Sequence, residues 1–540
     1  MNQPLESCPK WFRFLLLILL VVGIFFRLVN LDGKFYWFDE VYTSFRISGY
    51  TDTELYEQVY DGSVKTREQL QLYQGFNADK TWIDTVKGLA VEEPQLPPFY
   101  FVLARIWSQL FGNSVTVMRS LPALLSLLVF PSIYWLSIEL FASASVPWMA
   151  MGIVAISPFH ILYAQEARPY SLWTVLILAS SAALLQGMRI QTRKSWLIYA
   201  CLSVFSVYTF LYSVLVIVAH GVYVVWIEKG RLTHSLKGYL LGAGTGFLSL
   251  IIWLSLVLYW QQSAIPETSS TLTNFISRVG LIARWIGNFS RILLDFNLNV
   301  NTPLKELLPI LPLLLILLGI SAYSVYFLWQ NAPQDTRLFI VILIGVTTLP
   351  LMGIDFIKSW MRLSGVARYL IPWYLGVQLS LAYLFTLKLT QGPLKIWQQR
   401  FWQGIGIIVL FSGVMSSGMN AQAPTWWNKG LYQGDIMMPM AEILNTKTMP
   451  LLVSDDQFAG VFPFIYLVND QVRFEFVTSG NIPLIADNFH DVFLFRPSKG
   501  LREGIQERYQ VNLKMVDVPG EEDNGLFWQF EAYTNSKKSL

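Results

Sequence analysis

The chain has 540 residues, of which 54% are hydrophobic and only 14% are charged, and its formal net charge is +3. Soluble domains carry about a quarter charged residues, so this composition and a mean hydropathy of +0.44 indicate a protein solvated mainly by lipid. The small, dispersed net charge argues against a nucleic-acid partner. The two cysteines, Cys8 before the first apolar segment and Cys201 inside a later one, argue against a disulfide framework and a cysteine metal site.

The first apolar segment, near residues 12–30, predicts a helix that spans the membrane. Lys10 and Arg13 precede it and no small-residue cleavage site follows, so we interpret it as a retained anchor rather than a signal peptide. Because positively charged flanks stay in the cytoplasm, the N-terminus is expected there. The polar segment that follows, 31–95, is then expected outside.

A pair of adjacent carboxylates, Asp39 and Glu40, stands just after this span in an aromatic stretch. A carboxylate in a half-dry aromatic setting is costly to desolvate, and it can accept a proton from a substrate hydroxyl at the membrane surface. The alternative is a helix cap with an exposed acid, because Asp is common at helix starts. The pair is therefore a candidate catalytic site.

Residues 97–112 predict an amphipathic helix that lies along the outer membrane surface. The segment opens with Pro97 and Pro98, is too short for an ordinary span and contains Arg105. A short crossing is the alternative. A crossing would place every later basic loop outside, against the positive-inside rule.

Ten further apolar segments complete a count of about eleven spans. They are 119–141, 146–163, 170–188, 196–211, 213–227, 238–260, 306–329, 337–354, 369–387 and 402–420. With this count the basic loops at 188–194, 229–237 and 388–400 all stay in the cytoplasm. The segments 31–118, 261–305 and 355–368 and everything after 421 are then external.

Beyond residue 421 the composition changes to that of a soluble α/β domain. Strands are expected at 451–454, 472–477, 491–495, 509–516 and 526–533, with helices at 435–446 and 499–508. We therefore predict two domains. The first is a transmembrane catalytic domain over 1–420, whose external loop 31–118 carries surface helices, and the second is an external domain over 421–540.

Two further external segments carry charge. Glu166 and Arg168 lie in a short turn between two apolar helices, where they form a local ion pair or position a polar substrate. Lys358, Arg362 and Arg368 lie on a side where the positive-inside rule disfavours them. A lipid phosphate at the interface would explain them, because Arg gives bidentate hydrogen bonds and Lys a compact charge. Side chains that reach toward lipid headgroups are the alternative.

Several stretches resemble the polytopic GT-C glycosyltransferases, which include protein O-mannosyltransferases, the lipid A aminoarabinose transferase and many bacterial relatives. The matching stretches are Phe38–Glu40, Pro97–Tyr100, Leu110–Gly112, Met118–Leu124, Ser157–His160, Tyr163–Tyr170 and Arg368–Pro372. Their order and spacing cover about residues 1–390. The resemblance departs at Leu96, where relatives often carry His before the Pro-Pro pair, and beyond 421 it is only architectural.

The resemblance implies an α-helical polytopic membrane protein of GT-C fold, with about eleven transmembrane helices and a small C-terminal soluble α/β domain. It implies a cell-envelope enzyme that moves a sugar from a polyprenyl-phosphate donor to an acceptor on the external face of the plasma (inner) membrane. Asp39, with Glu40 beside it, takes the role of general base. The residues implied in substrate binding are Glu166, Arg168, Lys358, Arg362, Arg368 and Tyr369.

No glycine-rich phosphate loop and no His/Cys cluster with metal spacing occurs in the sequence, so we expect no cofactor and no metal. His160 is expected to be a buried, hydrogen-bonded core residue. Two other function classes remain open. A flippase or transporter of a lipid-linked glycan would need polar residues along the spans, and charges there are scarce. A membrane scaffold whose outer domain binds a partner is the third class.

Overall fold

The computed structural model describes residues 9–261, 275–298, 302, 304–390, 395–429, 434–518 and 525–531. The chain separates into two compact units. The first combines Met1–Leu31, Pro94–Tyr100 and Arg119–Gln422, and the second combines Asp32–Glu93, Phe101–Met118 and Ala423–Leu540.

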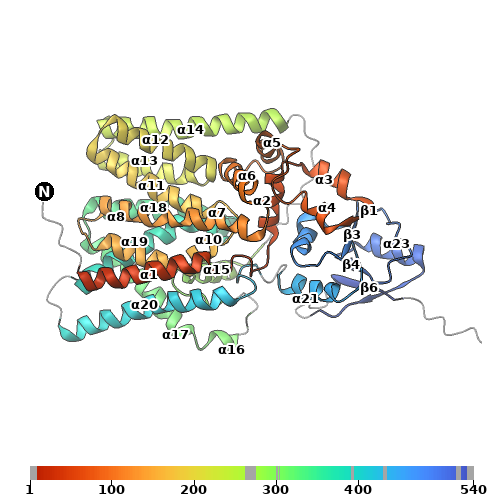
Figure 1. The fold of residues 1–540 in the computed structure, drawn as a ribbon. Coiled ribbons are helices and arrows are strands. Elements are labelled where there is room, and N and C mark those ends of the chain that lie inside the picture. The colour runs from red at the N-terminus through yellow and green to blue at the C-terminus, as the bar shows by residue number, and fades with distance from the viewer. Residues whose placement is uncertain are drawn as a thin grey trace, which may run out of the picture. The chain divides into compact units, whose positions relative to one another are not determined.

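The first unit is helical, and its long helices run alongside one another (Figure 1). They are α1 (Lys10–Leu28), α7 (Val115–Leu127), α8 (Val129–Leu140), α9 (Val146–Ala155), α10 (Pro158–Ala164), α11 (Tyr170–Ile190), α12 (Arg193–Thr209), α13 (Ser213–Ile227), α14 (His234–Gln261), α15 (Arg278–Ser290), α16 (Leu304–Leu307), α17 (Leu311–Asn331), α18 (Gln334–Lys358), η1 (Ala367–Leu370), α19 (Ile371–Thr390) and α20 (Ile396–Gln422). Figure 1 shows α12 and α14 side by side.

Two of these helices, α11 and α19, form the centre of the unit. Each is 89% buried over its most apolar window, whereas the corresponding windows of α1, α14, α17 and α18 are one-third buried or less. A helix that is apolar on all sides is buried when other helices surround it, and the outer helices present apolar faces to lipid instead. α11 begins just after the turn that contains Glu166 and Arg168, and α19 begins just after Arg368.

A broken span, α9 followed by α10, bends by 63° at Ser157-Pro158. Proline at the first position of α10 prevents the helix from continuing and leaves carbonyl groups of α9 without helical partners. Arg27 of α1 supplies them, because its guanidinium donates to the carbonyls of Ala155 at 2.5 Å and Val154 at 3.0 Å. The buried guanidinium therefore satisfies the break within the apolar core.

His160 lies in α10 and is buried, as expected from the sequence. Its Nε2 lies 2.9 Å from the side-chain oxygen of Gln378 in α19, and Gln378 donates in turn to the Ser157 hydroxyl at 3.2 Å. The expectation of a hydrogen-bonded core histidine is confirmed.

Eight helices in the described part of the chain are long and apolar enough to cross a membrane, or nine if the bent α9–α10 pair is one span. The predicted count of about eleven also includes α12 and α13, which have only 17 and 15 residues. The helical class is confirmed, and the number of crossings stays a prediction.

The second unit contains a six-stranded sheet of order β1-β3-β2-β4-β6-β5. Strands β3, β2 and β4 are parallel, and β1, β6 and β5 pair antiparallel at the two sides. The strands are β1 (Asp61–Thr66), β2 (Leu451–Ser454), β3 (Arg473–Val477), β4 (Val492–Phe495), β5 (Asn512–Met515) and β6 (Phe527–Glu531). The helices are α2 (Phe38–Ser48), α3 (Asp52–Val59), α4 (Arg67–Gln71), α5 (Trp82–Glu92), most of α6 (Phe99–Phe111), α21 (Gly434–Asn445), α22 (Phe458–Val461), η3 (Phe462–Tyr466) and α23 (Lys499–Tyr509).

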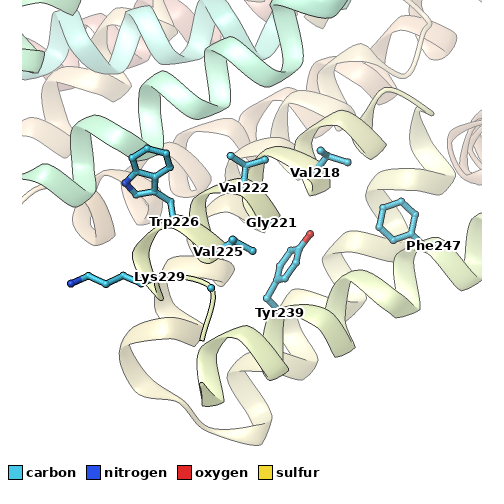
Figure 2. A pocket seen from close by; sticks show the side chains of 9 residues that line it. Val218, Gly221, Val222, Val225, Trp226, Lys229, Tyr239 and Phe247 are labelled. Carbon is cyan, nitrogen blue, oxygen red and sulfur yellow. The ribbon is translucent and has the colours of Figure 1, made fainter. Parts of the chain in front are cut away.

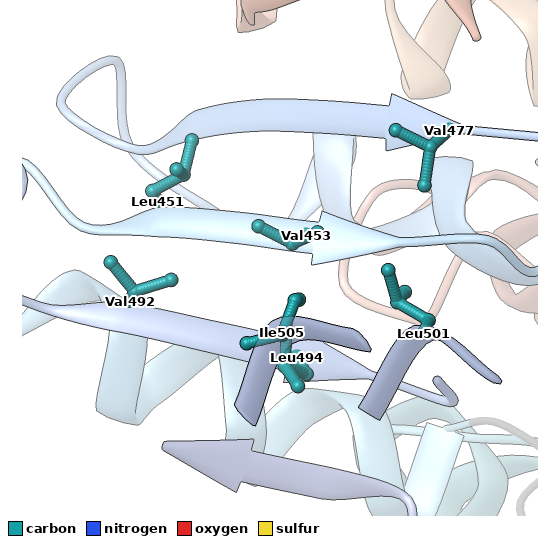
Figure 3. Close-up of a cluster of buried hydrophobic side chains, with 7 residues drawn as sticks. All are labelled: Leu451, Val453, Val477, Val492, Leu494, Leu501 and Ile505. Atoms are coloured by element: carbon teal, nitrogen blue, oxygen red, sulfur yellow. The ribbon is translucent and has the colours of Figure 1, made fainter. Parts of the chain in front are cut away.

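One face of this sheet packs against α23, and Figure 3 shows the buried side chains between them. Leu451 and Val453 of β2 and Leu494 of β4 lie against Leu501 and Ile505 of α23. Every residue of β2 and β4 is buried, as expected for parallel strands covered on both faces. The core thus explains why these strands read as continuous apolar runs.

The unit differs from the predicted division at residue 420, because strand β1 comes from the 31–118 segment and pairs with β3. A short, polar edge strand such as Asp61–Thr66 gives no alternating apolar signal. The compact unit around the C-terminal sheet therefore also includes most of the predicted external loop.

Helix α6 has 13 residues, too few to cross a bilayer. Arg105, which suggested an amphipathic surface helix, is buried instead. Its guanidinium donates to the carbonyls of Ser48 at 3.1 Å and Asn77 at 2.9 Å, and also to those of Ile47 and Lys80. Arg105 therefore holds the ends of neighbouring loops together within the second unit.

Candidate active site

In the second unit, Asp39 and Glu40 both lie in the first turn of α2. Glu40 is fully buried, and its carboxylate accepts a hydrogen bond from the Trp37 amide at 3.4 Å. This contact caps the helix. A helix cap was the alternative to a catalytic role for the two carboxylates, and Glu40 is the residue that forms it. Asp39 is partly exposed and lies at the positive end of the α2 dipole, which favours a carboxylate there.

Two buried lysines of the same unit, Lys34 and Lys429, each lie against a tryptophan ring, and neither was among the residues predicted from the sequence. Lys34 donates to the Ala423 carbonyl at 2.9 Å and lies 4.7 Å from the Trp426 ring centre. Lys429 lies 4.7 Å from the ring centre of Trp37. Lysine is seldom fully buried unless it is paired, so the two lysines are part of the local architecture of this segment. A lysine beside an aromatic run is the sequence signal that could have indicated them.

A third buried cation, Arg46, closes the other end of α2. Its guanidinium binds the carboxylates of Asp52 at 3.1 Å and Glu93 at 2.7 Å, and also that of Glu92. Burial, with the nearby Asp52 carboxylate, raises the pKa of Glu92 to about 7, although Arg46 acts in the opposite direction. Three carboxylates around one cation therefore make this cluster sensitive to pH near neutrality.

In the first unit, the turn that carries Glu166 and Arg168 is fixed to α1. The side chain of Gln165 donates to the carbonyls of Phe26 at 2.9 Å and Val29 at 2.8 Å at the end of that helix. Glu166 is fully buried and Arg168 nearly so. The turn is thus part of the packed core rather than an exposed hairpin.

Arg368, in η1, lies among aromatic rings contributed by α10, α11 and the loop before α13. Its guanidinium is 5.2 Å from the ring centre of Tyr170 and 5.5 Å from that of Tyr369. Tyr163 and Tyr170, which lie on either side of the Glu166–Arg168 turn in the sequence, have ring centres 5.3 Å apart. Phe210 and Tyr212 complete the ring cluster, since both contact Tyr369. The structure therefore brings Glu166, Arg368 and Tyr369 together, with Arg168 in the same turn as Glu166.

The cluster lies at the N-terminal ends of the two central helices. α11 starts at Tyr170, directly after the turn, and α19 starts at Ile371, directly after η1. The first amide groups of a helix point outward and carry partial positive charge, so they favour an anion. Arg368 and the starts of α11 and α19 therefore place positive charge at this aromatic cluster, and Arg168 lies in the turn just before α11.

Lys358 and Arg362 make different contacts. Lys358 is exposed, and the two cations share the ring of Trp360 at 5.8 Å and 5.4 Å from its centre. The described contacts place neither in the Tyr163–Tyr170 ring cluster, so their predicted part in substrate binding stays a prediction.

The loop that leads to Arg368 is held by Asp355, a buried residue that the sequence analysis missed. Its carboxylate accepts hydrogen bonds from the amides of Leu363 and Gly365, both at 3.1 Å, and from the Ser364 hydroxyl at 2.8 Å. A buried carboxylate with several donors fixes a loop firmly. An acid near the end of an apolar helix is the signal that could have indicated it.

No group of three or more His, Cys, Asp or Glu side chains that could hold a metal ion occurs in the described residues. The expectation that no metal is required stays a prediction.

A separate groove of about 690 Å³ lies between α13 and α14 (Figure 2). Val218, Gly221, Val222, Val225, Trp226, Lys229, Gly230, Tyr239 and Phe247 line it. Its walls are apolar and none of the predicted site residues lines it. The groove is therefore not part of the candidate site.

These observations define a multi-pass membrane protein with a central pair of buried helices and a second α/β unit. Comparison with family models and with curated proteins finds no match. Among solved structures, ArnT from Cupriavidus metallidurans in the apo state matches with a TM-score of 0.53 at 13% identity, over 96% of this chain and 97% of that chain. The same protein bound to undecaprenyl phosphate matches with a TM-score of 0.49 at 12% identity, over 97% and 98%.

The Archaeoglobus fulgidus oligosaccharyltransferase in the apo form matches 87% of this chain with a TM-score of 0.46 at 11% identity, and this chain spans 65% of its length. At such identities the likeness concerns the fold. The chain shares the fold of ArnT, so the predicted fold class, a helical polytopic membrane protein with a small C-terminal α/β part, is confirmed.

Proposed function

We propose that this protein is a membrane glycosyltransferase that moves a sugar from a polyprenyl-phosphate donor to a hydroxyl or similar nucleophile on an acceptor. The observation that carries the proposal is the site of Arg368. The Arg368 guanidinium lies against the aromatic cluster at the starts of α11 and α19, and the buried Arg168 lies in the turn just before α11, which suits an anionic phosphate. The fold that the chain shares with ArnT agrees with this assignment.

The reaction replaces the bond between the sugar and the phosphate oxygen by a bond between the sugar and the acceptor oxygen. In our proposal Asp39 accepts the proton that leaves the acceptor hydroxyl. The electron pair of the broken bond stays on the polyprenyl phosphate, whose added negative charge is stabilised by Arg368 and Arg168. No oxidant, reductant or further reactant is required.

The remaining predicted residues take supporting roles. Glu40 caps α2 and so orients the turn that presents Asp39. Glu166 and Tyr369 line the cluster around Arg368 and are assigned to the sugar and the donor. Lys358 and Arg362, next to Trp360, are assigned to the headgroup region of the lipid donor.

We further propose that the N-terminus is cytoplasmic and that residues 31–118 and 421–540 lie on the external face of the plasma membrane. The basic loops at 188–194, 229–237 and 388–400 support this orientation. The site would then take its donor from the outer leaflet.

The test is transfer of a radiolabelled sugar from a polyprenyl-phosphate donor by purified full-length protein in lipid nanodiscs. Labelled acceptor lipid or glycan, extracted from envelopes of the producing cell, is the expected product. A chain that moves donor across vesicles without making product would be a flippase. A chain that shows neither activity with any envelope fraction would be a scaffold, and either result would overturn the proposal.

A further inference from the structure

Helix α15 carries a row of large apolar side chains on its outer face. Val279 is 77% exposed, and Ile282 and Ile286, which lie three and seven residues further on, are 43% and 44% exposed. Residues at this spacing share one face of a helix, so Val279, Ile282 and Ile286 form an outer stripe on α15. Phe275, which lies before the start of α15 and forms a β-bridge with Trp360, is 69% exposed.

The inner face of the same helix includes the buried Leu281 and makes polar contacts. Arg284 and Asn288 donate to the Gly365 carbonyl at 3.0 Å and 3.1 Å, and the Trp285 indole donates to the Ser364 hydroxyl at 2.9 Å. These contacts bind α15 to the loop at 363–365, whose residues also hydrogen-bond to the Asp355 carboxylate. The loop leads within three residues to Arg368.

This arrangement is the reverse of an amphipathic helix on a water-soluble protein, which buries its apolar face. Exposing these apolar side chains to water would be unfavourable. Burying them in an apolar medium would gain the free energy of transfer from water. The surrounding medium of α15 is therefore expected to be apolar.

The neighbouring structure identifies that medium. Phe356, near the end of the apolar helix α18, stacks on Trp285 with 6.5 Å between ring centres and lies 5.2 Å from the Arg278 guanidinium. Ile354 and Ile357 beside it are exposed, as residues of a span that faces lipid are. The stripe of α15 thus continues a lipid-facing surface, and the exposed cations Arg278 and Lys358 at its edge suit phosphate headgroups.

We propose that α15 lies in the membrane interface, with the stripe of Val279, Ile282 and Ile286 inserted among the lipids, and that it holds the 359–366 loop at headgroup depth. The part about depth rests on the proposed function, because it makes α15 a positioning element for the donor site at Arg368. The insertion itself depends only on the observations above.

Insertion is tested with an environment-sensitive NBD label on single cysteines. The full chain, with both native cysteines removed by Cys8→Ser and Cys201→Ser, carries the label at Val279→Cys or Ile286→Cys. It is measured in nanodiscs whose lipids either lack a nitroxide or carry one near the headgroup. Lys499→Cys on exposed α23 is the control. At positions 279 and 286 we expect blue-shifted emission that the nitroxide lipids quench. At position 499 we expect the emission wavelength of NBD in water and no quenching.

Two other outcomes would overturn insertion. Aqueous emission at both stripe positions would show that the face is in water. Blue-shifted emission without quenching by nitroxide lipid would show that protein covers the stripe, either a second copy of the chain or another part of it.

Positioning is tested by transfer kinetics. Asn288→Ala removes one hydrogen bond to Gly365 without altering the stripe, and we expect it to raise KM for the donor about 2- to 10-fold with little change in kcat. Ile286→Glu should raise KM and reduce NBD quenching at 279 together. Leu72→Glu, which adds the same charge at an exposed leucine of the second unit, is the matched control and should change neither.

The two parts fail separately. Unchanged donor KM in Asn288→Ala and Ile286→Glu, with the labels inserted, would remove the positioning role. If the wild-type protein shows no transfer, the proposed function fails, while the quenching at 279 and 286 still decides whether α15 is inserted.

Discussion

The guanidinium of Arg368 lies 5.2 Å from the ring centre of Tyr170, which joins the start of α11 to the segment before α19. A guanidinium held over an aromatic face is fixed in orientation, and its planar fork of N–H donors matches the geometry of a phosphate. The contact therefore presents a cation in one orientation at the place where we propose that the donor binds.

We expect Tyr170→Leu to weaken binding of a polyprenyl-phosphate donor analogue, because the ring that holds Arg368 is lost. A partly desolvated cation–π contact is worth about 0.5–2 kcal/mol, which corresponds to a roughly 2- to 30-fold rise in Kd. Tyr170→Phe keeps the aromatic face and is the matched control. Equal affinity for the Leu and Phe variants would mean that the ring does not orient Arg368.

Asp39→Asn should abolish transfer while donor binding stays nearly unchanged. The amide is almost isosteric but cannot accept a proton, and loss of a general base costs about 10²–10⁴-fold in kcat. The measurement is kcat and donor Kd side by side. Near-normal turnover would exclude Asp39 as the base.

Glu40→Gln is the control for that experiment. The Gln side-chain oxygen can still accept the hydrogen bond from the Trp37 amide, so the helix cap and most of the activity should persist. A loss as large as that of Asp39→Asn would give Glu40 a chemical role instead.

Labelling of single cysteines in intact cells tests the membrane orientation. In the background without Cys8 and Cys201, Ser63→Cys and Lys499→Cys should react with a membrane-impermeant maleimide, because both positions are exposed and both lie in segments expected outside. Lys194→Cys, in a basic loop expected inside, is the control and should react only after lysis. The opposite pattern would reverse the topology.

The sequence predicted best those elements whose signal is local. Strand β2 was predicted at 451–454 and occurs there, because a parallel strand buried on both faces reads as an uninterrupted apolar run. Edge strand β1 was missed, since its polar residues are specified by pairing with β3 rather than by their own pattern. The bend between α9 and α10 was also missed, although Ser157-Pro158 marks it, because the apolar composition continues through it.

The site shows the same division. Glu166 and Arg368 were singled out because charges at the ends of apolar segments are conspicuous. Their association with the Tyr163–Tyr170 rings depends on the packing of α10, α11 and η1, which no local pattern encodes. Asp355 and Asn288 were missed for the same reason, since a buried polar residue is understood only through the partners that satisfy it.

The Arg46 cluster predicts how stability depends on pH. The pKa of Glu92 is raised to about 7 from its ordinary value of 4.5, so the folded state binds this proton more tightly than the unfolded state. Its contribution to stability is then complete below about pH 4.5 and is lost as the pH rises through about 7. Glu92→Gln should flatten this part of the Tm–pH profile of the full chain. A wild-type profile that rises between pH 5 and 7 and is unchanged by the substitution would contradict the assignment.

The last prediction separates a phosphate site from cations that merely reach toward headgroups. In the Arg362→Gln/Arg368→Gln double variant we expect donor affinity to fall by more than the ~1 kcal/mol of an exposed ion pair, because Arg368 lies against buried rings where its charge is partly desolvated. The loss should also persist at high salt, since salt screens buried pairs weakly.

Single variants divide the effect between the two arginines. We assign Arg362, which lies 5.4 Å from the ring centre of Trp360, to the headgroup region, so Arg362→Gln alone should cost little and its effect should fade with salt. Arg368→Gln alone should reproduce most of the loss. Equal donor affinity in the wild type and the double variant would leave headgroup contact as the role of both residues and would move the donor phosphate toward Arg168.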